Sequence, residues 1–104
     1  MALRSGEDLD LLVLTALHRQ PRYGYQLRYH LVSMSDERLR PSMTSLYDIL
    51  RRLERGGFVK ARRGSPGNTR GGRPRRYYQI TAKGRSELER RRQLLLSAWK
   101  WAGL

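Results

Sequence analysis

The sequence predicts a mainly α-helical fold with a small β-hairpin, in the order helix, helix, helix, strand, strand, helix. Three observations predict this order. Apolar residues recur at helical spacing in three segments before residue 57, two short β-forming segments flank a Gly- and Pro-rich stretch, and a long segment without proline follows. A chain of 104 residues is expected to form one domain with a modest core.

A first helix is expected because the apolar residues at positions 9, 12, 13, 16 and 17 follow the pattern of an amphipathic helix. Ser5 and the acid three residues later resemble a capping box, and Pro21 marks a stop after the helix. Leu11 and Leu14 lie off the main apolar stripe. A helix that is apolar on more than one side needs two partners, so these two leucines are expected to contact another chain.

A second helix is expected from about Arg22 to Ser33, and a polar loop that ends at Pro41 follows it. The third helix is the best defined. Ser42 is a candidate N-cap, an apolar stripe follows at helical spacing, and two glycines at 56 and 57 end the helix. Successive residues are rotated by about 100°, so the face opposite the apolar stripe is centred on Thr44, Asp48, Arg51 and Arg55.

Two strands are expected after the glycines, over residues 58–62 and 75–80. The loop between them, residues 64–74, contains four Gly and two Pro, as expected of a hairpin loop. Thr81 then caps a final helix, and this order of elements describes a winged helix-turn-helix with one added helix. A near-heptad apolar seam in the final helix is formed by Leu88, Leu95, Trp99 and Ala102.

The charge of the chain is large and unevenly distributed. Lys and Arg number 22 against 9 Asp and Glu, which gives a formal net charge of +13. Residues 1–57 carry a net charge of +2 and residues 58–104 carry +11, and residues 58–79 contain no acid. This asymmetry favours a polyanionic partner, and the excess of Arg over Lys favours nucleic acid.

Several classes of function are disfavoured. The chain has no cysteine, which excludes disulfides, thiol nucleophiles and thiolate metal sites. His18 and His30 are not spaced as metal ligands, and no serine has a histidine placed to form a nucleophile pair, so no enzyme, metal or cofactor is expected. The longest apolar run, residues 11–14, is far too short to span a bilayer, so we expect a cytoplasmic protein without a membrane partner.

Four segments in order along the chain carry a family resemblance: Tyr23–Leu27, Ser45–Glu54, Gly56–Val59 and Gly72–Thr81. They resemble the segments of PadR-like transcriptional regulators that open the second helix, form the recognition helix, lead into the wing and close it. The resemblance implies a dimeric DNA-binding regulator, commonly a repressor. Residues 1–81 would bind DNA, and residues 82–104 would form a dimerisation helix packed on the same domain. Asp48 departs from the family pattern, which has proline at that position.

The fold and the resemblance together predict where DNA is contacted. The third helix, residues 42–56, is expected in the major groove, and the basic wing, residues 62–76, on the backbone or in the minor groove. Arg51 suits either a guanine edge or a phosphate, and Tyr47 suits either a phosphate or packing against the wing. The expected DNA-binding residues are Tyr23, Ser42, Thr44, Ser45, Tyr47, Arg51, Arg52, Arg62, Arg70, Arg73, Arg75 and Arg76.

A homodimer on a palindromic operator is expected, with an interface of Leu11, Leu14, Leu88, Leu95 and Trp99. Trp99 and Trp101 have two interpretations. They form an apolar interface core, or, as in similar small PadR-like proteins, they bind a small aromatic effector between subunits. The alternative to a regulator of double-stranded DNA is a basic RNA-binding or architectural protein on the same winged-helix fold, which would not need a self-complementary dimer.

Overall fold

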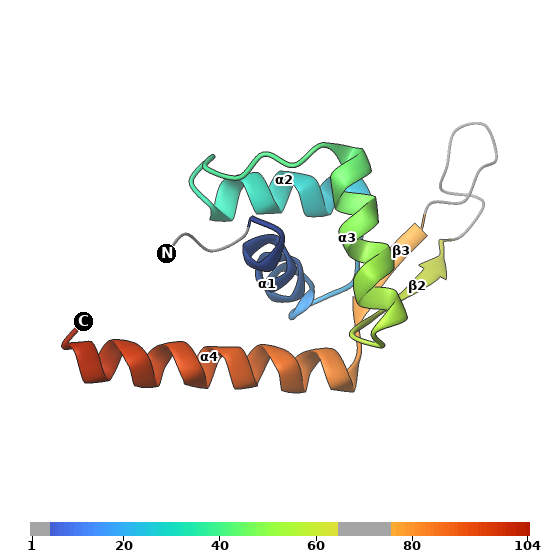
Figure 1. Ribbon diagram of the computed structural model, residues 1–104. Helices are drawn as coiled ribbons and strands as arrows, with labels where there is room; N and C mark the ends of the chain where they lie inside the picture. Colours follow the sequence, from blue (N-terminus) through green and yellow to red (C-terminus); the bar gives the residue numbers. More distant parts are fainter. Residues whose placement is uncertain (1–4, 65–75) are drawn as a thin grey trace.

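The computed structural model describes residues 5–64 and 76–104, and within them a mainly helical domain with one small sheet (Figure 1). The order α1-β1-α2-α3-β2-β3-α4 confirms the predicted winged-helix arrangement, with one additional strand. The helices are α1 (Ser5–Leu17), α2 (Gly24–Met34), α3 (Met43–Arg55) and α4 (Ala82–Ala102). The strands are β1 (Arg22–Tyr23), β2 (Val59–Arg63) and β3 (Arg76–Ile80).

The hydrophobic core is built around α1, which contacts α2, α3, β3 and α4. The prediction that Leu14 contacts another chain is wrong, because its side chain is fully buried in this core. The second apolar side of α1 is covered at Leu14 by elements of its own domain, whereas Leu11 is only partly buried. The largest fully buried side chains are Leu14, Leu17, Leu27, Leu31, Leu46, Leu50, Val13 and Val59.

The sheet contains a strand that the sequence did not predict. Arg22 and Tyr23, expected to begin the second helix, instead form β1 and pair antiparallel with Tyr78 and Tyr77 of β3. The Tyr23 and Tyr77 rings stack with centroids 3.9 Å apart. Since β3 also pairs with β2, the strand order is β1-β3-β2. The short strand β1 therefore ties the start of α2 to the wing, which here means β2, β3 and their connection.

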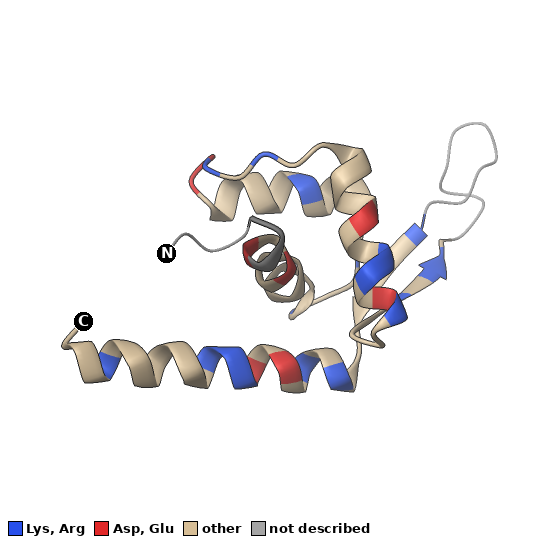
Figure 2. Cartoon of the chain, in the orientation of Figure 1, with Lys and Arg blue, Asp and Glu red and all other residues tan. Residues whose placement is uncertain are grey.

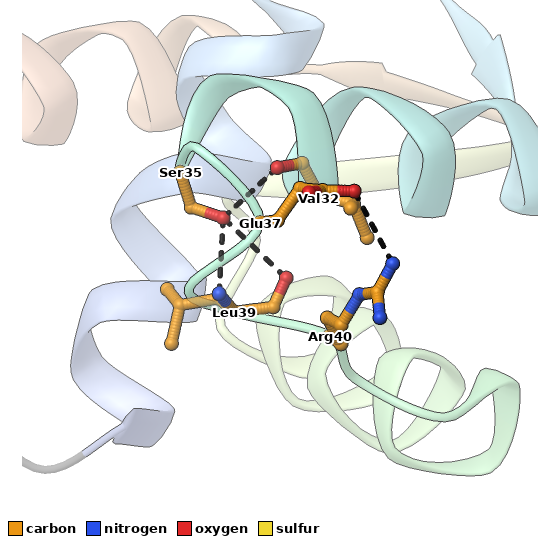
Figure 3. Close-up of polar contacts among 5 residues, drawn as sticks. All are labelled: Val32, Ser35, Glu37, Leu39 and Arg40. Carbon is orange, nitrogen blue, oxygen red and sulfur yellow. Dashed lines mark hydrogen bonds and ion pairs between the residues drawn. The ribbon is translucent and has the colours of Figure 1, made fainter.

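The turn between α2 and α3 is organised by one hydroxyl group (Figure 3). The Ser35 Oγ donates to the Val32 carbonyl at 3.2 Å and accepts from the Leu39 backbone N–H at 3.0 Å. Asp36 and Glu37 adopt positive φ angles of 54° and 62°, which reverse the chain direction. This turn sets the direction in which the chain leaves α2 and approaches α3.

The beginning of α4 is locked to the turn that follows α3. The Thr81 hydroxyl donates to the Gly57 carbonyl at 2.6 Å and accepts from the Gly84 N–H at 3.1 Å, as an N-cap does. Gly84 itself is buried against the Phe58 carbonyl; an added Cβ would lie 2.1 Å from that oxygen. These contacts fix the angle at which α4 leaves the domain.

α4 is 21 residues long and runs beneath α1, away from the sheet (Figure 1). The three consecutive arginines that interrupt its apolar seam pair with acids of the same helix. Arg90 and Arg91 contact Glu87, and Arg92 contacts Glu89 at 3.0 Å. Among the helices of the described residues, none has the length and hydropathy that crossing a bilayer requires.

The Glu87 carboxylate is expected to add stability that acid removes. Hydrogen bonds from Arg90, together with those from Arg91, lower the pKa of Glu87 from 4.5 to about 2. A depressed carboxyl pKa contributes stability that is fully present above pH 4.5 and is lost as the pH falls towards 2. Thermal unfolding of Glu87→Gln should therefore show a lower midpoint than wild type at neutral pH, and the difference should shrink between pH 4.5 and 2. A constant difference across that pH range would contradict this assignment.

Candidate nucleic-acid interface

α3 presents one fully apolar face to the core and one polar face to solvent. Its four buried side chains are Leu46, Ile49, Leu50 and Leu53. The side chains centred on the opposite face are exposed among residues 5–64 and 76–104. These exposed residues are Thr44, Asp48, Arg51 and Arg55.

Ser42 and Ser45 begin α3 and are linked to each other. The Ser42 Oγ accepts from the Ser45 backbone N–H at 3.0 Å and donates to the Ser45 Oγ at 3.0 Å. Ser42 is therefore the N-cap, as the sequence predicted. Both serines and Thr44 are exposed at the helix end that a helix-turn-helix turns towards base edges.

Two of the three arginines of α3 are held by acids, each by a different one. Arg51 donates to the Asp48 carboxylate one turn earlier on the same exposed face. Arg52 donates to the Asp10 carboxylate of α1 at 2.5 Å, so its guanidinium is held towards α1. Arg52, predicted as a DNA contact, thus has an intramolecular partner more than forty positions away in the chain, which local sequence patterns do not reveal.

A pocket of about 430 Å³ lies where α3, the start of α2 and the sheet meet. It brings together four of the predicted DNA-binding residues, Tyr23, Tyr47, Arg51 and Arg76, from separate parts of the chain. Tyr25 and Tyr78 also line the pocket. Neither was predicted to bind DNA, although Tyr25 and Tyr78 each belong to one of the family-like segments.

Tyr47 has a packing role as well as an exposed edge. Its ring lies 6.4 Å from that of Tyr78, centroid to centroid, and an added Cβ at Gly24 would lie 2.7 Å from the Tyr47 hydroxyl oxygen. The Tyr47 side chain is still 37% exposed, so it packs against the sheet and reaches solvent. Burial raises the pKa of the Tyr78 hydroxyl above its ordinary value.

The arginines in the described part of the wing are exposed. Arg62 lies on β2 opposite Tyr77, and Arg63 lies opposite Arg76 across the β2–β3 ladder. Figure 2 shows basic residues of α3, β2 and β3 at the same end of the molecule. Arg70, Arg73 and Arg75, which the sequence also assigns to DNA contact, lie outside the described residues.

A second surface feature is a groove of about 720 Å³ between α1 and α4. Four of the five residues predicted for a dimer interface line it, namely Leu11, Leu88, Leu95 and Trp99. Trp101 does not line this groove and is 90% exposed, because residues two apart on a helix point to nearly opposite sides. The structure therefore does not bring Trp99 and Trp101 together within one chain.

Within residues 5–64 and 76–104, no group of three or more His, Asp or Glu side chains is arranged to hold a metal ion.

The three-helix core, the exposed face of α3 and the paired strands beside it define a winged helix-turn-helix protein of the nucleic-acid-binding type. The chain belongs to the transcriptional regulator PadR-like family, whose model matches residues 13–90.

Solved structures support this family assignment. A transcriptional regulator from Clostridium thermocellum is 26% identical, with a TM-score of 0.73, over 90% of this chain and 88% of that one. A PadR family regulator from Eggerthella lenta is 30% identical, with a TM-score of 0.71, over 93% of this chain and 80% of that one. Bacillus subtilis PadR, solved in complex with operator DNA, shares the fold at 18% identity and a TM-score of 0.69, over 93% of this chain and 61% of that one.

Proposed function

We propose that this chain is a dimeric repressor that binds a palindromic DNA operator. α3 enters the major groove, and the basic wing contacts the backbone or the minor groove. The observation that carries the proposal is the exposed face of α3, which lies beside the exposed arginines of β2 and β3 with no other described element over it. The operator complex of Bacillus subtilis PadR, a protein of the same fold, supports the choice of double-stranded DNA as the partner.

The tyrosine and arginine pocket supports contact with the DNA backbone beside the major groove. Tyrosine hydroxyls donate hydrogen bonds to phosphate oxygens, and arginine forks bind them bidentately. Tyr47 comes from α3 and Arg76 from β3, so one such contact would fix the recognition helix and the wing on the duplex together.

Binding of promoter duplexes against structured RNA of equal length tests this function. We expect the protein to prefer duplex DNA containing its operator over the RNA at physiological salt. A preference for structured RNA would instead support the basic RNA-binding alternative, and equal affinity for all duplexes would support an architectural protein.

The groove between α1 and α4 supports a homodimer in which residues 82–104 supply the contact. The distal part of α4 exposes large apolar side chains that no described part of the chain covers. Trp99 is 46% exposed at the edge of the groove and Leu96 is 43% exposed, so a second copy would bury substantial apolar area there. Large exposed apolar patches are typical of protein interfaces.

Leu95→Glu is expected to convert the dimer into a monomer and to abolish operator binding. A carboxylate among the leucines and Trp99 of the groove would lose its hydration on association, at a cost of several kcal/mol. Ser97→Glu is the matched control, because Ser97 is exposed and lies outside the groove. Sedimentation velocity measures the outcome, and a Leu95→Glu variant that sediments as wild type would refute the proposed interface.

The proposed effector is a small planar aromatic compound that contacts Trp99 at this groove. An exposed indole beside leucines provides a flat apolar surface for such a ligand. Saturable quenching of tryptophan fluorescence in a Trp101→Phe variant, with release of bound DNA, would support regulation through Trp99. Quenching without release would show binding that does not regulate, and no quenching would leave Trp99 as interface core.

A further inference from the structure

Asp48 lies at the centre of the proposed recognition surface, where an acid is unexpected. Its carboxylate accepts a hydrogen bond from the Arg51 guanidinium, and both side chains are 59% exposed. Arg51 has five N–H donors in a fixed plane, so the contact with Asp48 leaves the rest of the fork available to a partner. The pair therefore presents adjacent donor and acceptor groups to whatever α3 contacts.

The pair is poorly suited to bind a backbone phosphate. Its two charges cancel, and the Asp48 carboxylate would repel a phosphate placed beside Arg51. The arginines of the wing are better suited to bind phosphate, since residues 58–79 contain no acid. The position of Asp48 in the middle of the exposed face of α3 instead directs the pair to the floor of the major groove.

A G·C base pair has the complementary pattern of groups in the major groove. Guanine offers two acceptors, O6 and N7, and cytosine offers the N4 amino donor. The free N–H groups of Arg51 match the guanine acceptors, and the Asp48 carboxylate matches the cytosine amine. In an A·T pair at the same place, adenine offers one acceptor, N7, beside a donor, the N6 amino group. The N6 donor would face an N–H donor of Arg51, which is less favourable than the two guanine acceptors.

We propose, building on the DNA-binding function proposed above, that the Asp48–Arg51 pair recognises a G·C base pair in each half of the operator. Arg51 contacts the guanine. Asp48 accepts a hydrogen bond from the cytosine amine, and it also orients the guanidinium and disfavours phosphate contact.

The test begins with selection of preferred sites from a random duplex library by the wild-type protein. Affinities are then measured for duplexes in which each base pair of the selected half-site is exchanged in turn. Wild type should prefer G·C at one position of each half-site by roughly 5- to 150-fold. Replacing that guanine by 7-deazaguanine, which lacks the N7 acceptor, should remove most of the preference.

Asp48→Ala should lower the preference at that position at least about fivefold and raise affinity for unrelated duplexes, because a repelling charge is removed. The matched control is Glu37→Ala, which removes an exposed acid paired with Arg40 three residues later, away from the α3 face. Glu37→Ala should keep the wild-type preference.

An unchanged G·C preference in Asp48→Ala would overturn this inference and leave the proposed function intact. A wild-type protein that selects no duplex sequence would contradict the proposed function itself.

Discussion

Raising the salt concentration from 50 to 200 mM should weaken binding of the dimer to duplex DNA by about 10³–10⁵-fold. This expectation follows from about 6–10 phosphate contacts per dimer, each of which releases condensed counterions from the DNA. The arginines of β2 and β3 are exposed, and no acid lies in residues 58–79 to neutralise them. Equilibrium titrations at several salt concentrations measure the slope.

An Arg62→Gln variant tests whether the wing makes these phosphate contacts. Removal of one phosphate contact per subunit should reduce the slope of log affinity against log salt by about 2 for a dimer. Lys100→Gln is the control, because it removes the same charge from the last turn of α4, at the end of the helix away from the sheet (Figure 1). An affinity that does not respond to salt, or equal slopes for both variants, would contradict phosphate binding by the wing.

Gly84→Ala should lower the free energy of unfolding by about 1–2 kcal/mol. An added Cβ would lie 2.1 Å from the Phe58 carbonyl oxygen and 2.7 Å from the Ile80 side chain, so α4 would have to move away from the turn after α3. Overpacking of this kind typically costs about 1–3 kcal/mol, and backbone contact places it at the upper end. The gain in helix propensity from Gly to Ala, about 1 kcal/mol, offsets only part of the cost.

Chemical denaturation monitored by circular dichroism measures this effect. Ser86→Ala is the control, since Ser86 is exposed in the same turn of α4 and should change stability by less than about 0.5 kcal/mol. A Gly84→Ala protein as stable as wild type would show that the start of α4 is not held against the Phe58 carbonyl.

Local patterns predicted the helices well because their ends carry chemical signals. Ser42 and Thr81 cap the starts of α3 and α4, and Gly56 is the C-cap at which α3 ends. The strand β1 was missed because Arg22 and Tyr23 become a strand only through pairing with β3, more than fifty residues later. No short-range signal reports such a pairing.

The difference between local patterns and long-range contacts also decides which parts of the candidate site were predicted. The exposed face of α3 follows from helical periodicity alone, so Thr44 and Arg51 were placed correctly on it. Leu14 was misassigned because periodicity shows that α1 has two apolar sides but not which element covers the second. The contact of Arg52 with Asp10 depends on how α1 and α3 pack, which the sequence of neither helix reveals.

The distribution of bound sites in the source cell tests the central claim most directly. Chromatin immunoprecipitation with the native protein should recover sites that share one two-fold symmetric sequence. Its half-site centres should be separated by about 10 base pairs, roughly 34 Å, or a multiple of that spacing, as the recognition helices of a two-fold dimer require. Bound sites without a common palindrome would contradict a dimeric regulator that recognises its operator through α3.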